Sequence, residues 1–253
     1  MYKDKKIIVV MPAYNAAKTI VKTYREVINQ NIADVIIIVD DASQDKTVSI
    51  ARKLSSDKVK TIVHAHKKNL GYGWNQKSCY KLALNEFADI VVLLHPDYQY
   101  TPQLLHAMIG MIVSGIYPCV LASRVLGGGA LEGGMPVWKY FINRCLTKME
   151  NFILGAHLSE YHTGYRAFSK ELLEDIPFER NSNGFIFDNE ILAQILWTNH
   201  SIGEISCPTN YFPEASVISF WNGVKYGFGC FRVALTYRLA KMRLIKSRLF
   251  PMR

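Results

Sequence analysis

Short runs of aliphatic residues alternate with longer helical patterns along the first half of this 253-residue chain. The runs IIVV at 7–10, VIIIV at 35–39 and IVVLL at 90–94 are apolar at every position instead of at every second one. A strand is apolar on both sides when helices cover both faces of its sheet, as they do in parallel sheets. We therefore predict an α/β fold of three layers around a mostly parallel central sheet. Ligands of such sheets bind at the carboxyl ends of the strands.

The same patterns give the expected order of elements. Strands are predicted at 7–10, 35–39, 59–63, 90–94, 119–122, 165–168 and 202–206. Helices are predicted at 16–30, 46–54, 73–86, 102–113, 137–154 and 185–197. The segment GGGALEGG at 127–134 has few side chains to pack and is predicted to be a flexible loop.

Positive charge is concentrated at the end of the chain. The chain carries 30 Lys and Arg against 21 Asp and Glu, a net charge of +9. Residues 215–253 contain no acid and hold the basic residues Lys225, Arg232, Arg238, Lys241, Arg243, Lys246, Arg248 and Arg253. We therefore predict an α/β domain at 1–214 and a separate basic, helical tail at 215–253.

The tail has two apolar surfaces when 224–249 is treated as one helix. A stripe flanked by basic residues is typical of a helix that lies on an anionic membrane surface, and consists of Val224, Phe228, Phe231, Leu235, Leu239, Met242 and Leu249. A second patch, of Val233, Tyr237 and Leu244, is expected of a helix that packs on the domain or in a homodimer. Both interpretations stay open.

No targeting or spanning segment is evident. The apolar run 7–11 is too short for a signal peptide, and no stretch reaches the roughly 20 residues that cross a bilayer. The five scattered cysteines lack C-x-x-C spacing, which indicates neither a disulfide framework nor a zinc site and favours a reducing compartment. We expect a cytoplasmic protein, with a peripheral position on the cytosolic membrane face left open. Nucleic acid is not an expected partner, because the chain outside the tail is nearly neutral.

Polar motifs follow the first three predicted strands. The first strand ends in Pro12-Ala13-Tyr14-Asn15, and Asp40 and Asp41 follow the second. Adjacent carboxylates can accept hydrogen bonds from a nucleobase edge and ribose hydroxyls, but they also suit a turn, with Ser43 or Asp45 capping the next helix. After the third strand, glycines in the segment NLGYG at 69–73 could let the backbone approach a ligand.

The fourth strand leads into His95-Pro96-Asp97-Tyr98-Gln99. Asp97 and Gln99 are spaced to direct two oxygen ligands the same way. Hard oxygen ligands suit Mg²⁺ or Mn²⁺ bridged to a diphosphate. The alternative is a simple turn after Pro96, since X-Pro-Asp turns are common.

Together these motifs resemble the family-2 glycosyltransferases of the GT-A (Rossmann-like) fold, most closely the dolichyl-phosphate (polyprenyl-phosphate) mannose synthase group. The resemblance covers residues 5 to about 212. The matching segments are PAYN at 12–15, DDASQDKT at 40–47, NLGYG at 69–73, PDYQYTP at 96–102, ASR at 122–124 and HTGYRAF at 162–168.

The resemblance implies an inverting, metal-dependent transfer of a hexose from a nucleotide sugar of the GDP-mannose or UDP-glucose type to a polyprenyl or dolichyl phosphate. It implies a nucleotide-sugar site of Pro12, Tyr14, Asn15, Asp40, Asp41, Asn69, Gly71, Gly73 and His95. It implies an Mg²⁺ or Mn²⁺ site of Asp97, Gln99 and His95, and acceptor or phosphate contacts from Arg124, Arg144 and Arg166. Asp97 and Arg124 are expected to serve catalysis.

The acceptor decides whether a base is needed. A lipid phosphate is already anionic at neutral pH, whereas a saccharide, glycolipid or protein hydroxyl needs a base, for which Asp188 and Glu190 are the candidates. Lone histidines such as His162 and His157 are expected to be hydrogen-bonding loop residues.

Two departures from the family pattern stand out. His95 replaces the first carboxylate of the usual D-x-D-x-Q metal motif, which leaves open a relative that binds nucleotide without turnover. The usual R-x-x-G-x-S-K segment is replaced by residues 212–217, so the phosphate contact expected there is missing or comes from elsewhere.

Overall fold

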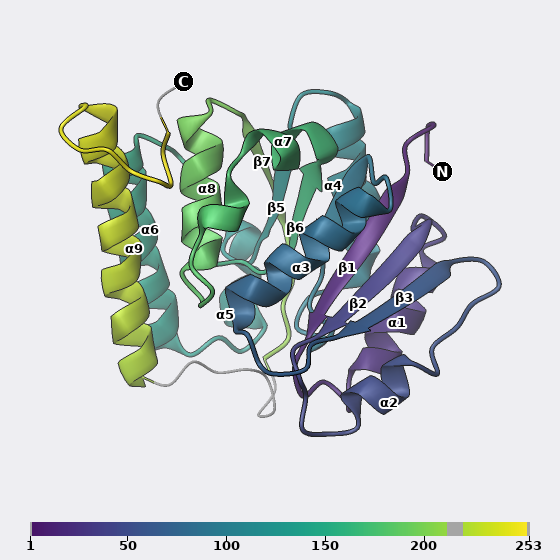
Figure 1. Ribbon diagram of the computed structural model, residues 1–253. Helices are drawn as coiled ribbons and strands as arrows, with labels where there is room; N and C mark the ends of the chain where they lie inside the picture. Colours follow the sequence, from purple (N-terminus) through teal and green to yellow (C-terminus); the bar gives the residue numbers. More distant parts are fainter. Residues whose placement is uncertain (1, 212–219, 252–253) are drawn as a thin grey trace.

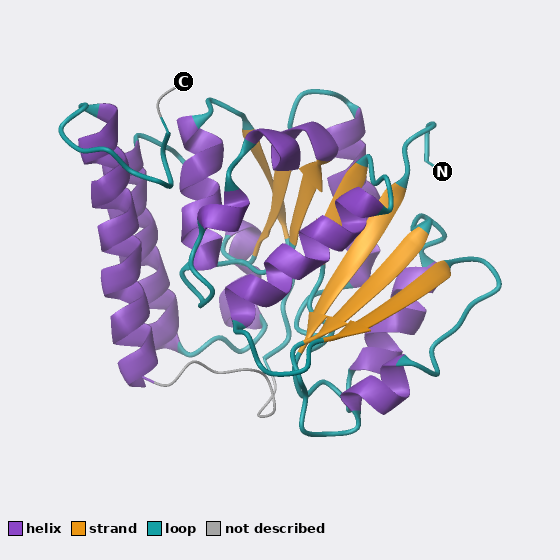
Figure 2. Ribbon diagram, viewed as in Figure 1, coloured by secondary structure: helices purple, strands orange, loops and turns teal. Residues whose placement is uncertain are grey.

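Helices cover both faces of a seven-stranded sheet (Figures 1 and 2). The computed structural model describes residues 2–211 and 220–251. The strands are β1 (Ile7–Ala13), β2 (Val35–Asp40), β3 (Lys60–Ala65), β4 (Ile90–Leu93), β5 (Cys119–Ser123), β6 (Arg166–Ser169) and β7 (Ile202–Ser206). The α-helices are α1 (Ile20–Asn29), α2 (Thr47–Ala51), α3 (Tyr72–Asn85), α4 (Leu105–Val113), α5 (Gly129–Glu132), α6 (Val137–Leu154), α7 (Lys170–Asp175), α8 (Phe187–Trp197) and α9 (Phe220–Lys241). Short 3₁₀ helices lie at Pro102–Leu104, Leu126–Gly128 and Phe178–Arg180.

The sheet is mostly parallel, as predicted. Its strand order is β3-β2-β1-β4-β6-β5-β7. The strand β6 runs antiparallel to its neighbours β4 and β5, and the other pairs are parallel. Because β1, β2 and β4 are adjacent and parallel, the motifs that follow them meet at one edge of the sheet.

The continuous apolar runs are explained by burial on both faces. Alternate residues of β1 face opposite cores: Ile8 and Val10 belong to the core formed with α3, α8 and α9, while Ile7 and Val9 belong to the core formed with α1 and α4. All seven residues of β1 are buried. The three-layer prediction is therefore confirmed.

The glycine-rich segment differs from its prediction. Instead of a loop, residues 126–132 form a 3₁₀ turn followed by the short helix α5. A Cβ atom on Gly133 would lie 1.7 Å from the carbonyl oxygen of Thr209, and one on Gly127 would lie 2.6 Å from Oγ of Ser206. The glycines therefore allow this segment to pack closely against the backbone that follows β7.

The helix α9 packs on the domain with one of its two apolar surfaces. Val233, Ala234 and Tyr237 are buried in the core that α9 shares with α8, whereas Leu244, predicted in the same patch, is 63% exposed. Most of the predicted stripe is exposed, with Phe228 70% exposed and Phe231 45% exposed, although Leu249 packs against the core. The packing interpretation thus describes one face, and most of the other face stays open to solvent.

The tail helix is shorter than the predicted 224–249. It ends at Lys241 because Arg243 adopts a left-handed conformation with φ 60°. The amide of Leu244 then donates to the carbonyl of Leu239 at 3.0 Å, the pattern that closes many helices. The chain turns back, and Phe250 packs against Trp197 and Tyr237. The predicted boundary at 214/215 lies outside the described residues.

None of the helices in residues 2–211 and 220–251 has both the length and the apolar character needed to cross a membrane.

Candidate functional site

The turn after β2 is fixed by its own acidic residues. Asp40 is fully buried and accepts hydrogen bonds from the amide and hydroxyl of Ser43. Asp45 accepts from the amide of Thr47, the first residue of α2, at 2.9 Å, which confirms the predicted capping contact. Asn15 joins this turn to β1, since its Oδ1 accepts from the amide of Gln44 at 2.9 Å. The nucleotide roles of Asp40 and Asn15 remain predictions.

Asp41 organises the loop that follows β3. Its Oδ1 accepts from the amide of Leu70 and lies 2.8 Å from Nδ1 of His66, and its Oδ2 accepts from the amide of Gly71 at 2.9 Å. The carboxylate is only 3% exposed. In this conformation Asp41 therefore holds the loop after β3 in place, and its predicted contact with a nucleobase stays a prediction.

The glycines of the NLGYG segment approach protein backbone. A Cβ on Gly71 would lie 2.7 Å from the carbonyl oxygen of Asn183, and one on Gly73 would lie 2.5 Å from that of Ser182. Asn69 closes the turn by accepting from the amide of Gly71 at 3.1 Å. The glycines were predicted to let the backbone approach a ligand closely. In the structure the backbone at Gly71 and Gly73 instead closely approaches the loop before α8. The nucleotide roles of Asn69, Gly71 and Gly73 remain predictions.

At the end of β1, Pro12 is buried beside β2 and Tyr14 is 49% exposed. Of the predicted nucleobase contacts, Tyr14 therefore offers the most accessible surface, a phenol ring on which a base could stack.

His95 is held by Tyr72. The two rings stack with their centroids 5.5 Å apart, and Nε2 of His95 lies 3.2 Å from the Tyr72 hydroxyl. That hydroxyl donates to Oδ2 of Asp188 at 2.8 Å. The His95 ring also packs so tightly on Gly164 that a Cβ there would lie 2.9 Å from Cδ2. The imidazole that replaces the family carboxylate is therefore linked to Asp188.

Asp188 has both carboxylate oxygens engaged. Besides Tyr72, Gln76 donates to Oδ1 at 3.0 Å, and Nη1 of Arg166 lies 3.5 Å from the same oxygen. Burial and the Asp188 charge raise the pKa of the Tyr72 phenol well above its ordinary value, so Tyr72 is a proton donor to this carboxylate. Glu190, two residues along α8, instead accepts from the amide of Ser182 at 2.6 Å.

Asp97 and Gln99 lie on a turn made by a left-handed residue, Tyr98, with φ 60°. Oδ1 of Asp97 accepts from the amide of Gln99 at 3.1 Å. Within the described residues, Oδ2 of Asp97 makes no hydrogen bond and the carboxylate is half-buried. A carboxylate oxygen and an amide oxygen two residues apart fit Mg²⁺ or Mn²⁺. His95 is directed to Tyr72, so its metal role stays a prediction.

Arg124 forms a buried ion pair with Glu160. Nε of Arg124 donates to Oε1 at 2.8 Å, and the backbone amide of Arg124 donates to Oε2 at 2.8 Å. Burial disfavours the charge, but Glu160 raises the pKa of Arg124 well above its ordinary value. Nη1 of Arg124 also donates to the Tyr211 hydroxyl at 3.0 Å. The guanidinium is therefore fixed in position beside the site.

The other predicted phosphate contacts lie in different surroundings. Arg166 is fully buried and donates to the carbonyls of residues 161, 163 and 188, so its contacts favour a positioning role under Asp188. Arg144 is half-buried and donates to the carbonyl of Ser159 at 2.7 Å. Their phosphate roles remain predictions.

Sequence reasoning missed three residues at this site: Tyr72, Glu160 and Lys139. Tyr72 lies inside the NLGYG segment, so the motif signal was present. Glu160 gives no local signal, because its partner Arg124 is 36 residues away. Lys139 lies near the start of α6, with Nζ 5.4 Å from the centre of the Tyr211 ring. Burial, and then the charge of Arg124, lower the pKa of Lys139.

Comparison with known proteins identifies the class. Residues 8–177 match the family described as glycosyl transferase family 2, so the chain belongs to that family and is a glycosyltransferase. The fold agrees: the crystal structure of glucosyl-3-phosphoglycerate synthase from Mycobacterium tuberculosis in complex with Mn²⁺, UDP and glucosyl-3-phosphoglycerate superposes with a TM-score of 0.64. That match has 17% identity and covers 93% of this chain and 80% of the other. The predicted GT-A fold is thereby confirmed.

Two relatives match nearly the whole chain. The UDP-N-acetylglucosamine–dolichyl-phosphate N-acetylglucosaminyltransferase of Methanococcus voltae is 29% identical over 251 residues, which cover 94% of this chain and 98% of the relative. The dolichyl-phosphate hexose transferase of Haloferax volcanii is 26% identical over 241 residues, with the same coverage of 94% and 98%. The predicted resemblance to lipid-phosphate sugar transferases is confirmed.

The contact between Gly164 and His95 gives a prediction. The substitution Gly164→Ala should destabilise the protein by about 1–3 kcal/mol, because the added methyl group overlaps the His95 ring. In a His95→Ala background the same substitution should cost much less, since the opposing atoms are gone. Denaturant unfolding of the four proteins measures this coupling directly. Equal costs in the two backgrounds would show that the two residues do not constrain each other.

Proposed function

We propose that this glycosyltransferase transfers a hexose, with inversion, from a nucleoside diphosphate sugar to a polyprenyl or dolichyl phosphate. The observation that carries the proposal is the state of Asp188, the candidate base. Both of its oxygens already accept or face donors from Tyr72, Gln76 and Arg166. Both oxygens of this carboxylate are directed at protein donors, so an acceptor hydroxyl would have to displace one of these contacts to reach it. An acceptor phosphate, whose oxygen is already anionic, requires no such step.

The surroundings of Glu190 support the same conclusion. Its Oε2 accepts from the amide of Ser182, and the nearby ammonium of Lys77 donates to the side chain of Asn183 at 2.9 Å. Both contacts stabilise the loop that packs on Gly71 and Gly73. Glu190 thus has a structural task, and the hydroxyl-acceptor alternative must rely on Asp188.

On the donor side, Asp97 and Gln99 would hold Mg²⁺ or Mn²⁺. When bound, such a cation stabilises the negative charge of the leaving diphosphate. The nucleotide would lie along the ends of β1 and β2, with Tyr14 against the base and the loop held by Asp41 along its side. The Mycobacterium tuberculosis neighbour was crystallised with Mn²⁺ and UDP, which agrees with this arrangement. The names of the two relatives point to dolichyl phosphate as acceptor.

Lys139 is the best-placed guide for the acceptor phosphate. Arg124 is neutralised by Glu160, whereas Lys139 is half-buried next to Arg124 and makes no ion pair within the described residues. An anionic phosphate would offset the burial that lowers the pKa of this ammonium. Lys139 also lies in the first turn of α6. The outer side chains of this helix are apolar, so a phosphate bound at Lys139 would have its lipid chain beside α6.

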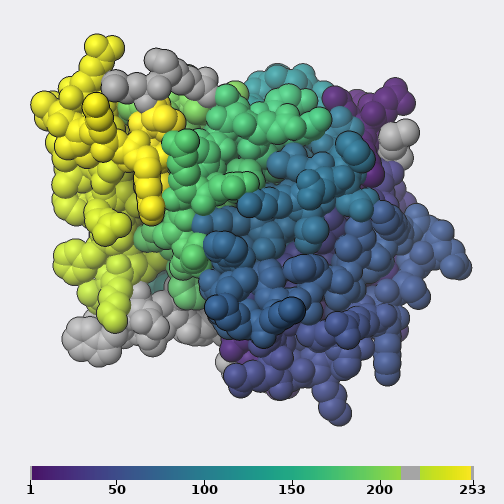
Figure 3. Space-filling view, in the orientation of Figure 1, coloured from purple at the N-terminus to yellow at the C-terminus, as the bar shows by residue number. Residues whose placement is uncertain are grey.

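The outer faces of α6 and α9 suit an anionic lipid surface. We call these exposed side chains the α6–α9 outer face; they are Val137, Trp138, Phe141, Ile142 and Phe152 of α6, and Val224, Phe228, Phe231 and Leu235 of α9. The two helices pack side by side (Figure 1), and α9 lies along one edge of the molecule (Figure 3). The same two helices also carry four exposed basic residues, Lys148, Lys225, Arg232 and Arg238. Glu150 is the single acid of the two helices, and it is buried.

A transfer assay tests the proposed reaction. The protein, Mn²⁺, polyprenyl phosphate and each of UDP-glucose, GDP-mannose and UDP-N-acetylglucosamine, labelled in the sugar, are expected to give a labelled lipid that extracts into organic solvent with at least one donor. Asp97→Asn should lower the rate about a hundredfold or more. The cation loses its carboxylate ligand, so the negative charge that develops on the leaving diphosphate is no longer stabilised. Failure of all three donors to label the lipid would contradict the proposal.

The same assay separates the acceptor classes. Asp188→Asn keeps the shape of the side chain and should leave transfer to the lipid phosphate within about tenfold of the parent rate. Loss of all turnover in this variant, with nucleotide binding and the unfolding temperature unchanged, would instead identify a base and favour the hydroxyl acceptor.

Membrane binding gives an independent prediction. Phe141 and Phe228 are 64% and 70% exposed, so the double substitution Phe141→Ser, Phe228→Ser should leave the fold intact. Co-flotation with vesicles that contain anionic lipid should fall at least tenfold, because burial of one phenyl side chain in the interface contributes about 1.5–3 kcal/mol. Phe87→Ser, at a residue 79% exposed and distant from this face in sequence, is the matched control. An equal loss in the control, or no flotation of the parent, would contradict the assignment of the face.

A further inference from the structure

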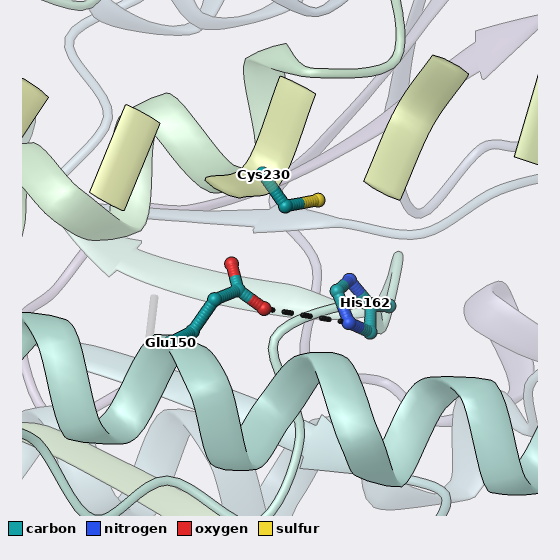
Figure 4. Close-up of side chains that lie close together, drawn as sticks. All are labelled: Glu150, His162 and Cys230. Atoms are coloured by element: carbon teal, nitrogen blue, oxygen red, sulfur yellow. Dashed lines mark ion pairs between the residues drawn. The ribbon is translucent and has the colours of Figure 1, made fainter. Parts of the chain in front are cut away.

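Three side chains from separate parts of the fold meet beneath the α6–α9 helix pair (Figure 4). Glu150 comes from α6, His162 from the loop before β6, and Cys230 from α9. One ligand atom of each lies within 4.8 Å of those of the other two. Carboxylate, imidazole and thiol are the three donor types that bind Zn²⁺ in proteins. The cluster shares no residue with the proposed site of Asp97 and Gln99. It offers nitrogen and sulfur ligands as well as oxygen, whereas Asp97 and Gln99 offer oxygen alone.

Two atoms of this cluster are buried without a hydrogen-bond partner. They are Oε2 of Glu150 and Nε2 of His162. The two side chains are 2% and 9% exposed, and the two atoms lie 3.5 Å apart. A buried polar atom without a partner costs free energy, so a pair of such atoms facing each other requires an explanation.

The surrounding hydrogen bonds fix the state of the imidazole. The Tyr226 hydroxyl donates to Oδ1 of Asn189 at 2.7 Å, so its oxygen accepts the hydrogen on Nδ1 of His162, 3.0 Å away. With its proton on Nδ1, neutral His162 directs the lone pair of Nε2 towards Oε2 of Glu150. Either the proton of a neutral Glu150 carboxyl or a metal cation between the two atoms would satisfy both of them.

We propose that Glu150, His162 and Cys230 bind a transition-metal cation of the Zn²⁺ type. The mixed oxygen, nitrogen and sulfur donors fit Zn²⁺ better than Mg²⁺, which requires oxygen ligands. Tyr226 and Asn189 supply the outer contacts that orient metal ligands: Tyr226 holds Nδ1 of His162, and Asn189 donates to Oε1 of Glu150.

The position of the site gives it a structural consequence. The metal would join α9 to α6 and to the loop that carries His162, whose carbonyl oxygen accepts from Nη2 of Arg124 at 2.9 Å. The metal would thus connect the helices α6 and α9 to the part of the candidate active site that contains Arg124.

Cobalt substitution tests the site on the full-length protein. Metal-stripped protein titrated with Co²⁺ should develop a thiolate-to-cobalt absorption band that saturates at a single equivalent and is lost on addition of Zn²⁺. Cys230→Ser should abolish the band. Cys145→Ser, at the exposed cysteine, and Asp97→Asn, at the proposed catalytic metal site, should both keep it.

A second variant guards against misfolding. Glu150→Gln preserves the size of the side chain and should weaken Co²⁺ binding about tenfold to a hundredfold. Zn²⁺ should also raise the unfolding temperature of the parent protein and not that of Cys230→Ser, because a ligand stabilises only the form that binds it. A parent protein without the band, or a band that persists in Cys230→Ser, would overturn the proposal and leave a proton shared by Glu150 and His162. Since Asp97 takes no part, either result leaves the proposed transfer reaction untouched.

Discussion

Buried charges beneath the strand ends constrain the rest of the site. Arg166 is fully buried and lies under Asp188, and Arg124 is buried against Glu160. A buried charge is tolerated only when a partner and further hydrogen bonds satisfy it, and removal of one partner is strongly destabilising. Because Arg166 is held in this way, it fixes the position of Asp188, which in turn holds Tyr72 and, through Tyr72, His95. His95 lies two residues before Asp97, so these contacts bear on the turn that carries the metal motif.

The parts of the fold that depend on local sequence were predictable. The apolar runs at 7–10, 35–39 and 90–94 predicted the buried strands, because a strand that is buried on both faces is apolar at consecutive positions. The capping contact of Asp45 is also local. The end of α9 was missed because Arg243, a residue without a turn signature, adopts the left-handed conformation. The glycine segment was misjudged because its partner, the backbone of 206–209, lies about 80 residues further along.

Contacts between distant segments account for what sequence could not give at the site. The sequence treats Arg166 as a phosphate ligand and His162 as a loop residue. The structure places Arg166 among backbone carbonyls, and it brings His162 to Glu150 and Cys230 from three elements. Scattered cysteines gave no reason to expect a metal, because the usual signal is close spacing along the chain. The motifs were predicted to meet at one edge of the sheet, and they do. The motifs did not reveal which of the side chains there are already engaged by other parts of the protein.

The central claim is that Asp97 and Gln99 seat a divalent cation on the diphosphate of an activated sugar. A crystal grown with Mn²⁺ and a nucleoside diphosphate sugar, with manganese located by anomalous scattering, tests it most directly. The account predicts manganese coordinated by Asp97 and Gln99 and by diphosphate oxygens, with the base near Tyr14. Manganese elsewhere, or a diphosphate bound away from this turn, would contradict it.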